Sequence, residues 1–213
     1  GDYVVKFTVF GEGGSTTVTE TITITQDDPS NCEPILNFLT GCGEKTWSLF
    51  NGEGALFVGP GDGSVWWQNT AADATTRSCD WNDTYTFKKE STVFDYKANG
   101  DFWGEAYTGV SPDGCEDIVN LDPSIAAWGD GVHSFEIIPA TTTTPDQLKV
   151  VGLGAFIGLR KAVNGSELAA PITLVNSVTY DILSRTTVNG KDLLELQVDS
   201  GGVFWKFILE SAI

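Results

Sequence analysis

The stretch VTYDILSRTTVNGKDLLELQVDSGGVFWKFIL, residues 178–209, contains three short runs in which apolar and polar residues alternate. Alternation with a period of two is typical of β-strands that bury one face. The runs are VTYDILS (178–184), LLELQV (193–198) and VFWKFIL (203–209), separated by the turn signals NG (189–190) and SGG (200–202). The stretch therefore predicts three consecutive short strands joined by turns.

Five runs closer to the N-terminus have the same character. They are TWSLF (46–50), DTYTFKK (83–89), TVFDYK (92–97), HSFEIIP (133–139) and LKVVG (148–152). Eight short strands with Gly- and Asn-containing turns predict an all-β domain, and we expect an antiparallel two-sheet β-sandwich of the jelly-roll kind. The segment GLGAFIG (152–158) superficially matches a dinucleotide-binding loop, but no βαβ unit surrounds it, so we expect a strand with glycines.

One short helix is predicted in NCEPILNFLTG, residues 31–41. Asn31 can cap its start, Pro34 lies in the first turn, and Gly41 ends it. We assign no other helix to the chain.

The first 25 residues form a separate pattern. YVVKFTVF (3–10) and STTVTETITIT (15–25) alternate on either side of GEGG (11–14), which predicts a two-stranded ribbon. An isolated ribbon is marginally stable in water, so it must pack on something or belong to a larger neighbour. QDDPSN (26–31) resembles a linker, and residues 32–213 form the main domain.

Charge limits the partners of the protein. Its 213 residues include 12 basic and 29 acidic side chains, which gives 12 − 29 = −17. Such a negative charge argues against binding to nucleic acid or to anionic membranes, and fits a neutral ligand such as an uncharged glycan, or a cation. No apolar run reaches the roughly 20 residues of a membrane-spanning helix. With neither a signal peptide nor an initiator methionine, the chain has the form of a mature or excised piece.

Four cysteines without C-x-x-C spacing predict two disulfides in an exported protein. Of the three connectivities, we favour Cys32–Cys42, which closes a short helical turn, and Cys79–Cys115, which ties the loop after a tryptophan pair to a later loop. The single histidine cannot complete a familiar zinc site with these cysteines.

Seven tryptophans are many for a chain of this length. Trp47 and Trp205 alternate with apolar residues and are expected in the core. Trp66, Trp67, Trp81, Trp103 and Trp128 lie beside Gly, Asp and Asn, and three of these five fall in the long Gly- and Asp-rich segment 51–82. Long loops in compact domains are usually functional or disordered.

An indole ring stacks on the apolar face of a sugar, while neighbouring amides and carboxylates bind its hydroxyl groups. We therefore expect a carbohydrate-binding site in which one of Trp66 and Trp67 packs inward and the other faces the ligand. The full set of expected site residues is Trp66, Trp67, Trp81, Trp103, Tyr107, Asp62, Gln68, Asn82 and Glu105. The alternative is that these rings are structural and that the domain is a spacer or a protein-docking module.

Catalysis is not expected, because no paired-carboxylate motif or nucleophile motif is present. The rival hypothesis is a small glycoside hydrolase that uses Glu105 and a nearby aspartate. The Asp clusters 59–63, 79–83, 111–117 and 128–131 could supply oxygen ligands to a structural calcium, although none has calcium-hand spacing. No other cofactor is expected.

Two sets of motifs resemble known families. The pattern of residues 3–25 resembles the last two strands of a polycystic-kidney-disease domain, which is immunoglobulin-like. From residue 32 on, motifs in order resemble a module of surface glycan-binding lipoproteins and laminarin-type β-1,3-glucanases of gram-negative polysaccharide degraders. They are KTWSLF, GEGALFVGPGDG, WWQN, TRSCDWNDTYTF, GDFWGEAYTGVSPDGC, GLGAFIGLRKAVNGSELAAPITLVNSVTYDI and GGVFWKFIL.

The second resemblance implies non-catalytic binding of a β-glucan, with laminarin as the first candidate, on the outer surface of the outer membrane. The partner implied is a neighbouring porin-type glycan importer, and any lipid-anchor cysteine would lie upstream of residue 1. The family pattern also has cysteines at the positions of Cys79 and Cys115, which supports that pair, but it does not supply Cys32 and Cys42.

Overall fold

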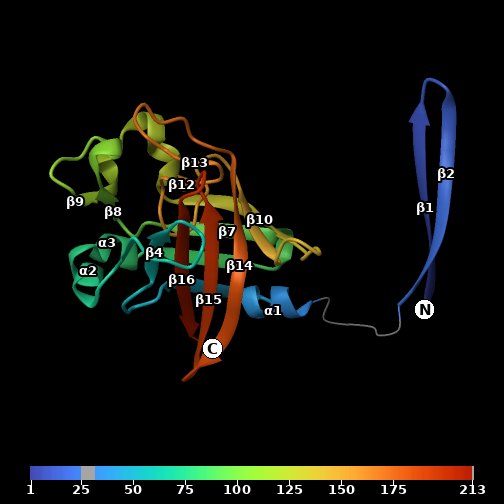
Figure 1. Ribbon diagram of the computed structural model, residues 1–213, viewed down its shortest axis with the longest axis horizontal. Coiled ribbons are helices and arrows are strands. Elements are labelled where there is room, and N and C mark those ends of the chain that lie inside the picture. The colour runs from blue at the N-terminus through green and yellow to red at the C-terminus, as the bar shows by residue number, and fades with distance from the viewer. Residues whose placement is uncertain (25–31, 213) are drawn as a thin grey trace. The chain divides into compact units, whose positions relative to one another are not determined.

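The computed structural model describes residues 1–24 and 32–212. The chain divides into two compact units, Gly1–Glu33 and Pro34–Ile213 (Figure 1). The linker expected at 26–31 lies outside the described residues.

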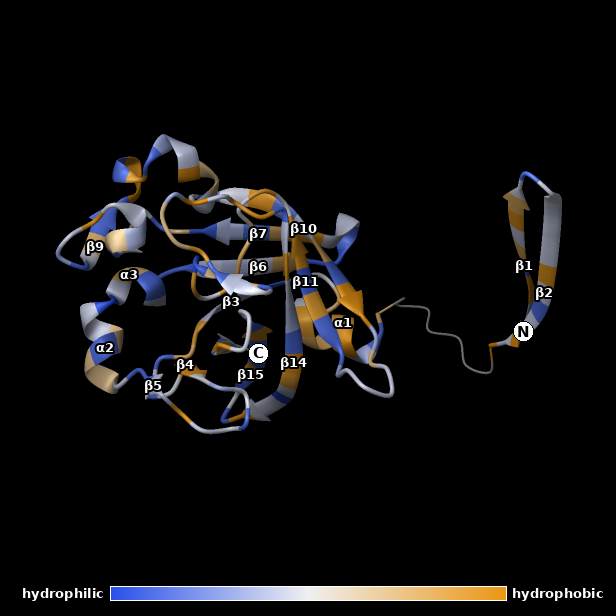
Figure 2. Ribbon diagram, turned by 45° about the horizontal axis from the view of Figure 1, so that its top comes forward, coloured by the Kyte–Doolittle hydropathy of each residue, from blue (hydrophilic) through white to orange (hydrophobic). Residues whose placement is uncertain are grey.

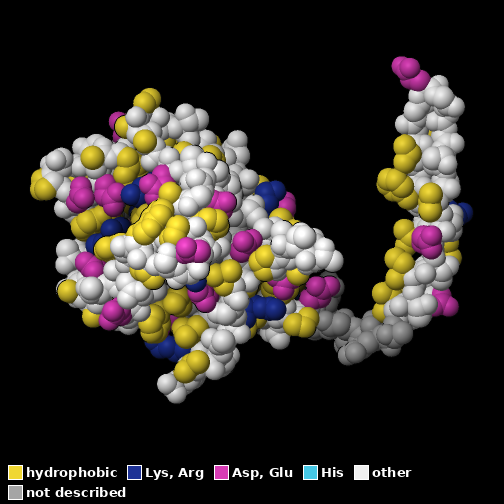
Figure 3. Space-filling model, viewed as in Figure 1, with side chains coloured by type: hydrophobic (Ala, Val, Ile, Leu, Met, Phe, Trp, Pro, Cys, Tyr) yellow, Lys and Arg dark blue, Asp and Glu magenta, His cyan; other side chains and the backbone are white. Residues whose placement is uncertain are grey.

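The N-terminal unit holds the predicted hairpin. Strands β1 (Asp2–Gly11) and β2 (Gly14–Thr23) pair antiparallel in continuous register from Asp2↔Thr23 to Gly11↔Gly14. Residues directly opposite each other share a face, so Tyr3 with Ile22 and Phe7 with Val18 make one face apolar. These side chains are exposed, and apolar groups run along the hairpin in Figure 3.

The second unit is built on a closed antiparallel barrel of eight strands. The ring order is β15-β14-β11-β10-β7-β6-β3-β16, and pairing of β16 with β15 closes it. Its strands, in chain order, are β3 (Glu44–Leu49), β6 (Thr84–Lys88), β7 (Val93–Lys97), β10 (Gly131–Ile138), β11 (Gln147–Val151), β14 (Ser177–Val188), β15 (Lys191–Asp199) and β16 (Phe204–Ala212). Each strand neighbours the next of these in sequence, which is the up-and-down arrangement.

All eight strands predicted from the sequence are therefore present, and the all-β class is confirmed. The expected two-sheet sandwich of the jelly-roll kind was wrong, because the eight strands form one sheet that closes on itself. Alternation fixes which side chains of a strand are buried, and the inner faces of a barrel and of a sandwich have the same period.

The barrel interior is filled by large side chains. Alternate residues of each strand point inward, as in Tyr85 and Phe87 of β6 and Phe94 and Tyr96 of β7, while polar residues between them face outward. The alternation is visible as stripes of contrasting colour along β14 in Figure 2. Trp47 and Trp205 also lie in this core, as predicted.

Helix α1 (Pro34–Thr40) covers one end of the barrel, and it is the helix that the sequence predicted. The Nε1 atom of Trp47 donates to the carbonyl of Leu39 at 2.9 Å. Lys45 donates to the carbonyl of Phe38 and pairs with the buried Asp192. The predicted cap Asn31 lies outside the described residues.

The opposite end is closed by residues 152–161. Residues 152–158 of it were expected to be a strand with glycines, but the segment is an irregular loop. Gly154 and Gly158 have φ angles of 75° and 77°, and a Cβ on Gly158 would lie 2.1 Å from the ring of Phe207. The loop can enter the mouth of the barrel because these positions carry no side chain.

Smaller elements complete the domain between the barrel strands. They are β4 (Leu56–Gly59), β5 (Trp67–Gln68), α2 (Ala71–Thr76), α3 (Ser78–Trp81), β8 (Asp101–Gly104), β9 (Gly114–Asp117), β12 (Ala162–Val163), β13 (Ser166–Glu167) and the 3-10 turns η1 (Glu90–Thr92), η2 (Ala106–Thr108), η3 (Ile118–Asn120) and η4 (Pro123–Trp128). The expectation of one short helix was thus wrong. Segment 51–82 is not a long open loop, since it contains two strands and two helices.

Candidate functional site

The expected binding residues fall into three places on the barrel domain. The segment around β5 holds Trp66, Trp67, Asp62 and Gln68. Trp81 and Asn82 lie at the end of α3. Trp103 lies in β8, and Glu105 and Tyr107 follow that strand. Both ribbon views place β4, α2, α3 and β9 on one side of the domain (Figures 1 and 2).

The first place is an exposed apolar surface, which we call the indole platform and define as Val65, Trp66 and Trp67. Strand β5 pairs with β4, with Trp67 opposite Val58, and β4 pairs with β16 of the barrel. The amide of Trp66 donates to the carbonyl of Val58 at 2.9 Å. Backbone pairing to a barrel-attached strand therefore holds the platform in place without burying its side chains.

The structure corrects one expectation about this pair. Trp66 is 60% exposed and Trp67 38%, so neither indole packs inward to anchor the segment. The neighbouring anchor is Asn69, which is fully buried, accepts from the amide of Leu56 and donates to the carbonyl of Gly52.

The polar residues expected beside the platform are both exposed. Asp62 accepts hydrogen bonds from the hydroxyl and the amide of Ser64. Both bonds lower the pKa of the Asp62 carboxyl, and the bond from the hydroxyl has the larger effect. Gln68 donates to Glu53 at 3.2 Å. Asp62 thus stabilises its own turn, and Gln68 lies at the edge of the platform.

The second place is a groove on the outer wall of the barrel, which we call the seam groove. Its volume is about 480 Å³, and it lies between β3, the α2–α3 segment and Glu210 near the end of β16. Trp81 forms part of its wall, with Nε1 donating to the carbonyl of Phe50 at 3.0 Å. Asn82 also lines it and donates to Asp101 at 2.8 Å.

The third place is a set of rings paired with cations. The guanidinium of Arg77 lies 4.6 Å from the centre of the Trp103 ring, and the indole N–H of Trp103 donates to Glu105. Lys161 pairs with Glu105 at 3.3 Å and lies 5.7 Å from the centre of the Tyr107 ring. These contacts already engage the groups that would bind a sugar, so this set is stabilised within the protein itself.

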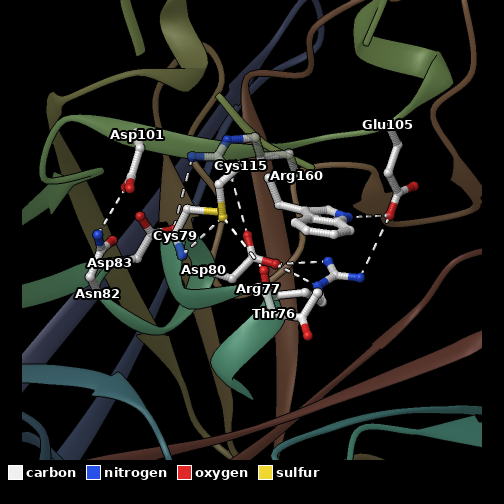
Figure 4. The surroundings of a disulfide bond; sticks show 11 residues. Thr76, Arg77, Cys79, Asp80, Asn82, Asp83, Asp101, Glu105, Cys115 and Arg160 are labelled. Atoms are coloured by element: carbon white, nitrogen blue, oxygen red, sulfur yellow. Dashed lines mark hydrogen bonds and ion pairs between the residues drawn. A yellow bond between two sulfur atoms is a disulfide. The ribbon is translucent and has the colours of Figure 1, made fainter. Parts of the chain in front are cut away.

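Beneath this set lies a buried ionic cluster that the sequence analysis did not find (Figure 4). Arg160, from the loop that closes the barrel, donates to the hydroxyl of Tyr96 at 2.6 Å, and that hydroxyl donates to Asp83 at 2.9 Å. Asp80 approaches Arg160 at 3.7 Å and accepts from Arg77 at 2.7 Å. Arg160, Asp80 and Asp83 are all buried.

Burial dominates the electrostatics of this cluster. It raises the pKa of Asp80 despite the opposing charges of Arg77 and Arg160, and it raises the pKa of Asp83 further. Burial also raises the pKa of Tyr107. The only advance signal for the cluster was an arginine within an otherwise apolar, glycine-rich stretch, GLGAFIGLR.

The expected disulfide between Cys79 and Cys115 is present, and it ties α3 to β9 across 36 residues. Cys32 and Cys42 are disulfide-bonded as well. The first bond fastens the α2–α3 wall of the seam groove to the neighbouring hairpin of β8 and β9.

The acidic residues considered for catalysis or calcium have other partners. Asp80 and Asp83 are buried against arginine, Asp101 accepts from Asn82, and Asp130 accepts from the amide of Ala98. Among residues 1–24 and 32–212, no three His, Cys, Asp or Glu side chains are grouped so that they could hold a metal ion. Within the same ranges, no helix has the length and apolar character needed to cross a membrane.

No protein-family model matches the chain, and no curated protein sequence is significantly similar to it. The two family resemblances therefore rest on the quoted motifs, and they remain predictions.

Proposed function

We propose that the barrel domain is a non-catalytic module that binds a neutral polysaccharide, with the β-1,3-glucan laminarin as the first candidate. In this proposal the protein acts at the outer surface of the outer membrane and presents captured glycan to an importer. The indole platform stacks on the apolar faces of the sugar rings, and Gln68 binds hydroxyl groups at its edge.

The observation that carries the proposal is the exposure of two adjacent indoles on a segment held by strand pairing. Soluble proteins seldom expose contiguous large apolar side chains without a binding role. Aromatic faces with nearby amides are the pairing that sugar recognition requires. The net charge of −17 favours a neutral ligand over an anionic one. Because large side chains fill the barrel, the outer surface is where a long chain would bind.

The hydrolase hypothesis requires an accessible pair of carboxyl groups. Glu105 is held by Lys161 and Arg77, and Asp80 and Asp83 are buried. These contacts favour a structural role for the acids and make binding without hydrolysis the better proposal. Assaying reducing-sugar release from laminarin tests this directly: turnover that disappears in Glu105→Gln would establish the enzyme.

Affinity electrophoresis tests the proposal. The full chain is run in native gels that contain laminarin, mixed-linkage β-glucan or a charged polysaccharide. We expect retardation in the β-glucan gels and none in the charged gel. Equal mobility in every gel would remove the binding role and favour a spacer or docking domain.

A further inference from the structure

We infer that the seam groove is a second binding surface for the same ligand, so that a neutral polysaccharide chain extends from the indole platform along the outer face of β3. The inference rests on the proposed function and adds the residues that would bind the chain beyond the platform. It is carried by the shape of the groove, the polar side chains that line it and its position.

The groove exists because β16 changes partners along its length. Its first half pairs with β4, from Phe204↔Gly59 to Phe207↔Leu56, and its second half pairs with β3 at two positions, Leu209↔Leu49 and Glu210↔Ser48. A hollow of about 250 Å³ continues the groove past this short pairing and shares Ser48 and Glu210 with it. The wall of the barrel is therefore indented along β3 and flanked by α2 and α3.

Polar side chains line the groove. Ser48, Asn51, Thr75 and Ser78 are among them, and Asn51, Thr75 and Ser78 are exposed, so a ligand can reach them. Hydroxyl and amide groups in a concave site, beside an aromatic wall, are the groups that orient a hydroxyl-rich ligand.

The aromatic wall is already positioned for a ligand. The N–H group of Trp81 is bound to the carbonyl of Phe50, and part of the indole packs on the core, so its orientation is set before binding. A preformed wall lowers the entropy cost of binding. Glu210, which lines the groove, pairs at 2.8 Å with Lys191, which lines the adjoining hollow, so the negative charge of Glu210 is balanced. This favours a neutral polyol over an anion.

The groove and the indole platform are connected through the chain. Asn51 lines the groove, and two residues later Glu53 accepts from Gln68 of β5. The amide of Gly54 donates to the carbonyl of Asn69, which follows β5 directly. Segment 50–54 thus joins the two surfaces, and in this inference one extended ligand contacts both.

The test compares arginine substitutions on the α2–α3 segment. Thr75 and Ser78 are exposed and line the groove, whereas Ala72 is exposed on the same helix as Thr75 but does not line it. Calorimetric titration of the full chain with laminarin should show binding weakened by about tenfold in Thr75→Arg and in Ser78→Arg. Ala72→Arg adds the same charge and should bind like the wild type.

Each outcome is decisive for a different claim. If both groove variants bind laminarin as tightly as Ala72→Arg, the groove is not a binding surface, while the platform proposal stands. If the wild type does not bind laminarin or any other neutral glycan, the proposed function fails and the groove inference with it. Thermal unfolding of each variant distinguishes weakened binding from misfolding.

Discussion

Two regions of the molecule have similar composition but differ in how far their side chains are buried. GDGSVWWQN (61–69) and CDWNDTY (79–85) both combine tryptophan with aspartate and asparagine. In the first, every residue but Asn69 is exposed. In the second, Cys79, Asp80, Asp83 and Tyr85 are buried. Composition alone therefore does not distinguish a binding surface from a structural cluster.

The two regions differ in which side chains from distant parts of the chain contact them. Asp80 and Asp83 meet Arg160, which is about 80 residues away in the chain and fully buried. The platform receives backbone hydrogen bonds from β4, and its side chains stay exposed. Acidic and aromatic residues become structural where a distant cation meets them, and they stay on the surface where none does.

The largest expected effect comes from breaking the buried cluster. Arg160→Leu leaves Asp80 and Asp83 buried without their cation, so we expect the free energy of unfolding to fall by about 3–5 kcal/mol in urea titrations. Arg185→Leu is the matched control, since Arg185 is partly exposed and pairs with Asp146 at 3.6 Å. Its loss should stay below about 1 kcal/mol. Similar losses at both sites would contradict the structural role given to the cluster.

The next effect separates the disulfide from the platform. Replacing Cys79 and Cys115 together by serine removes a cross-link that spans 36 residues, and should lower the free energy of unfolding by about 2–4 kcal/mol. Because the platform is held by β4 and not by this bond, laminarin retardation by the folded variant should persist. Loss of binding without loss of fold would show that the two regions depend on each other.

A smaller, pH-dependent effect compares the two ends of the barrel. Burial acts to raise the pKa of Asp192, but hydrogen bonds from Lys45 and Thr187 and the charge of Lys45 outweigh it, so the pKa is lowered. Its stabilising contribution is therefore complete above the unfolded pKa of about 4, and is lost as the pH falls through the lowered value. At the other end of the barrel, the pKa values of Asp80 and Asp83 are raised. Their contribution to the free energy of unfolding therefore falls as the pH rises from the unfolded pKa toward the raised value, which is the opposite pH dependence.

Urea titrations from pH 7 to pH 3 measure this contribution. Asp192→Asn should be less stable than the wild type at pH 7, and the difference should shrink toward pH 3 as Asp192 becomes protonated in the wild type. A difference that does not change with pH would contradict the ionic role of Asp192.

Much of the fold was predictable because it depends on local pattern. Alternation identified the eight barrel strands, and the turn signal at 189–190 agrees with a hairpin in which Asn189 and Gly190 both have positive φ angles. Closure of the sheet was not predictable, since it depends on pairing of β16 with both β15 and β3. Residues 152–158 were misassigned to a strand because the apolar residues of this loop fill the barrel mouth and have the composition of a strand.

The sequence indicated which types of residue belong to the candidate site, but it did not show which of them lie together in space. The glycine-rich surroundings of Trp66 and Trp67 indicated that one of the two indoles is exposed, and both are. Trp103, Glu105 and Tyr107 had the same kind of surroundings, but Arg77 and Lys161 engage them, and no local pattern reveals those partners. The seam groove is formed by β3, α2, α3 and β16, so no single stretch of sequence contains it.

The most direct test of the account is calorimetric titration of laminarin into the wild-type chain and into the double variant Trp66→Ala/Trp67→Ala. Trp66 is 60% exposed and Trp67 38%, so the free energy of unfolding should fall by about 1–3 kcal/mol, mainly through the covered part of Trp67, and urea titration checks that the variant is folded. We expect measurable binding by the wild type and at least about a tenfold loss in the double variant. Equal affinity of the two proteins would contradict the claim that the exposed indoles form the glycan-binding platform.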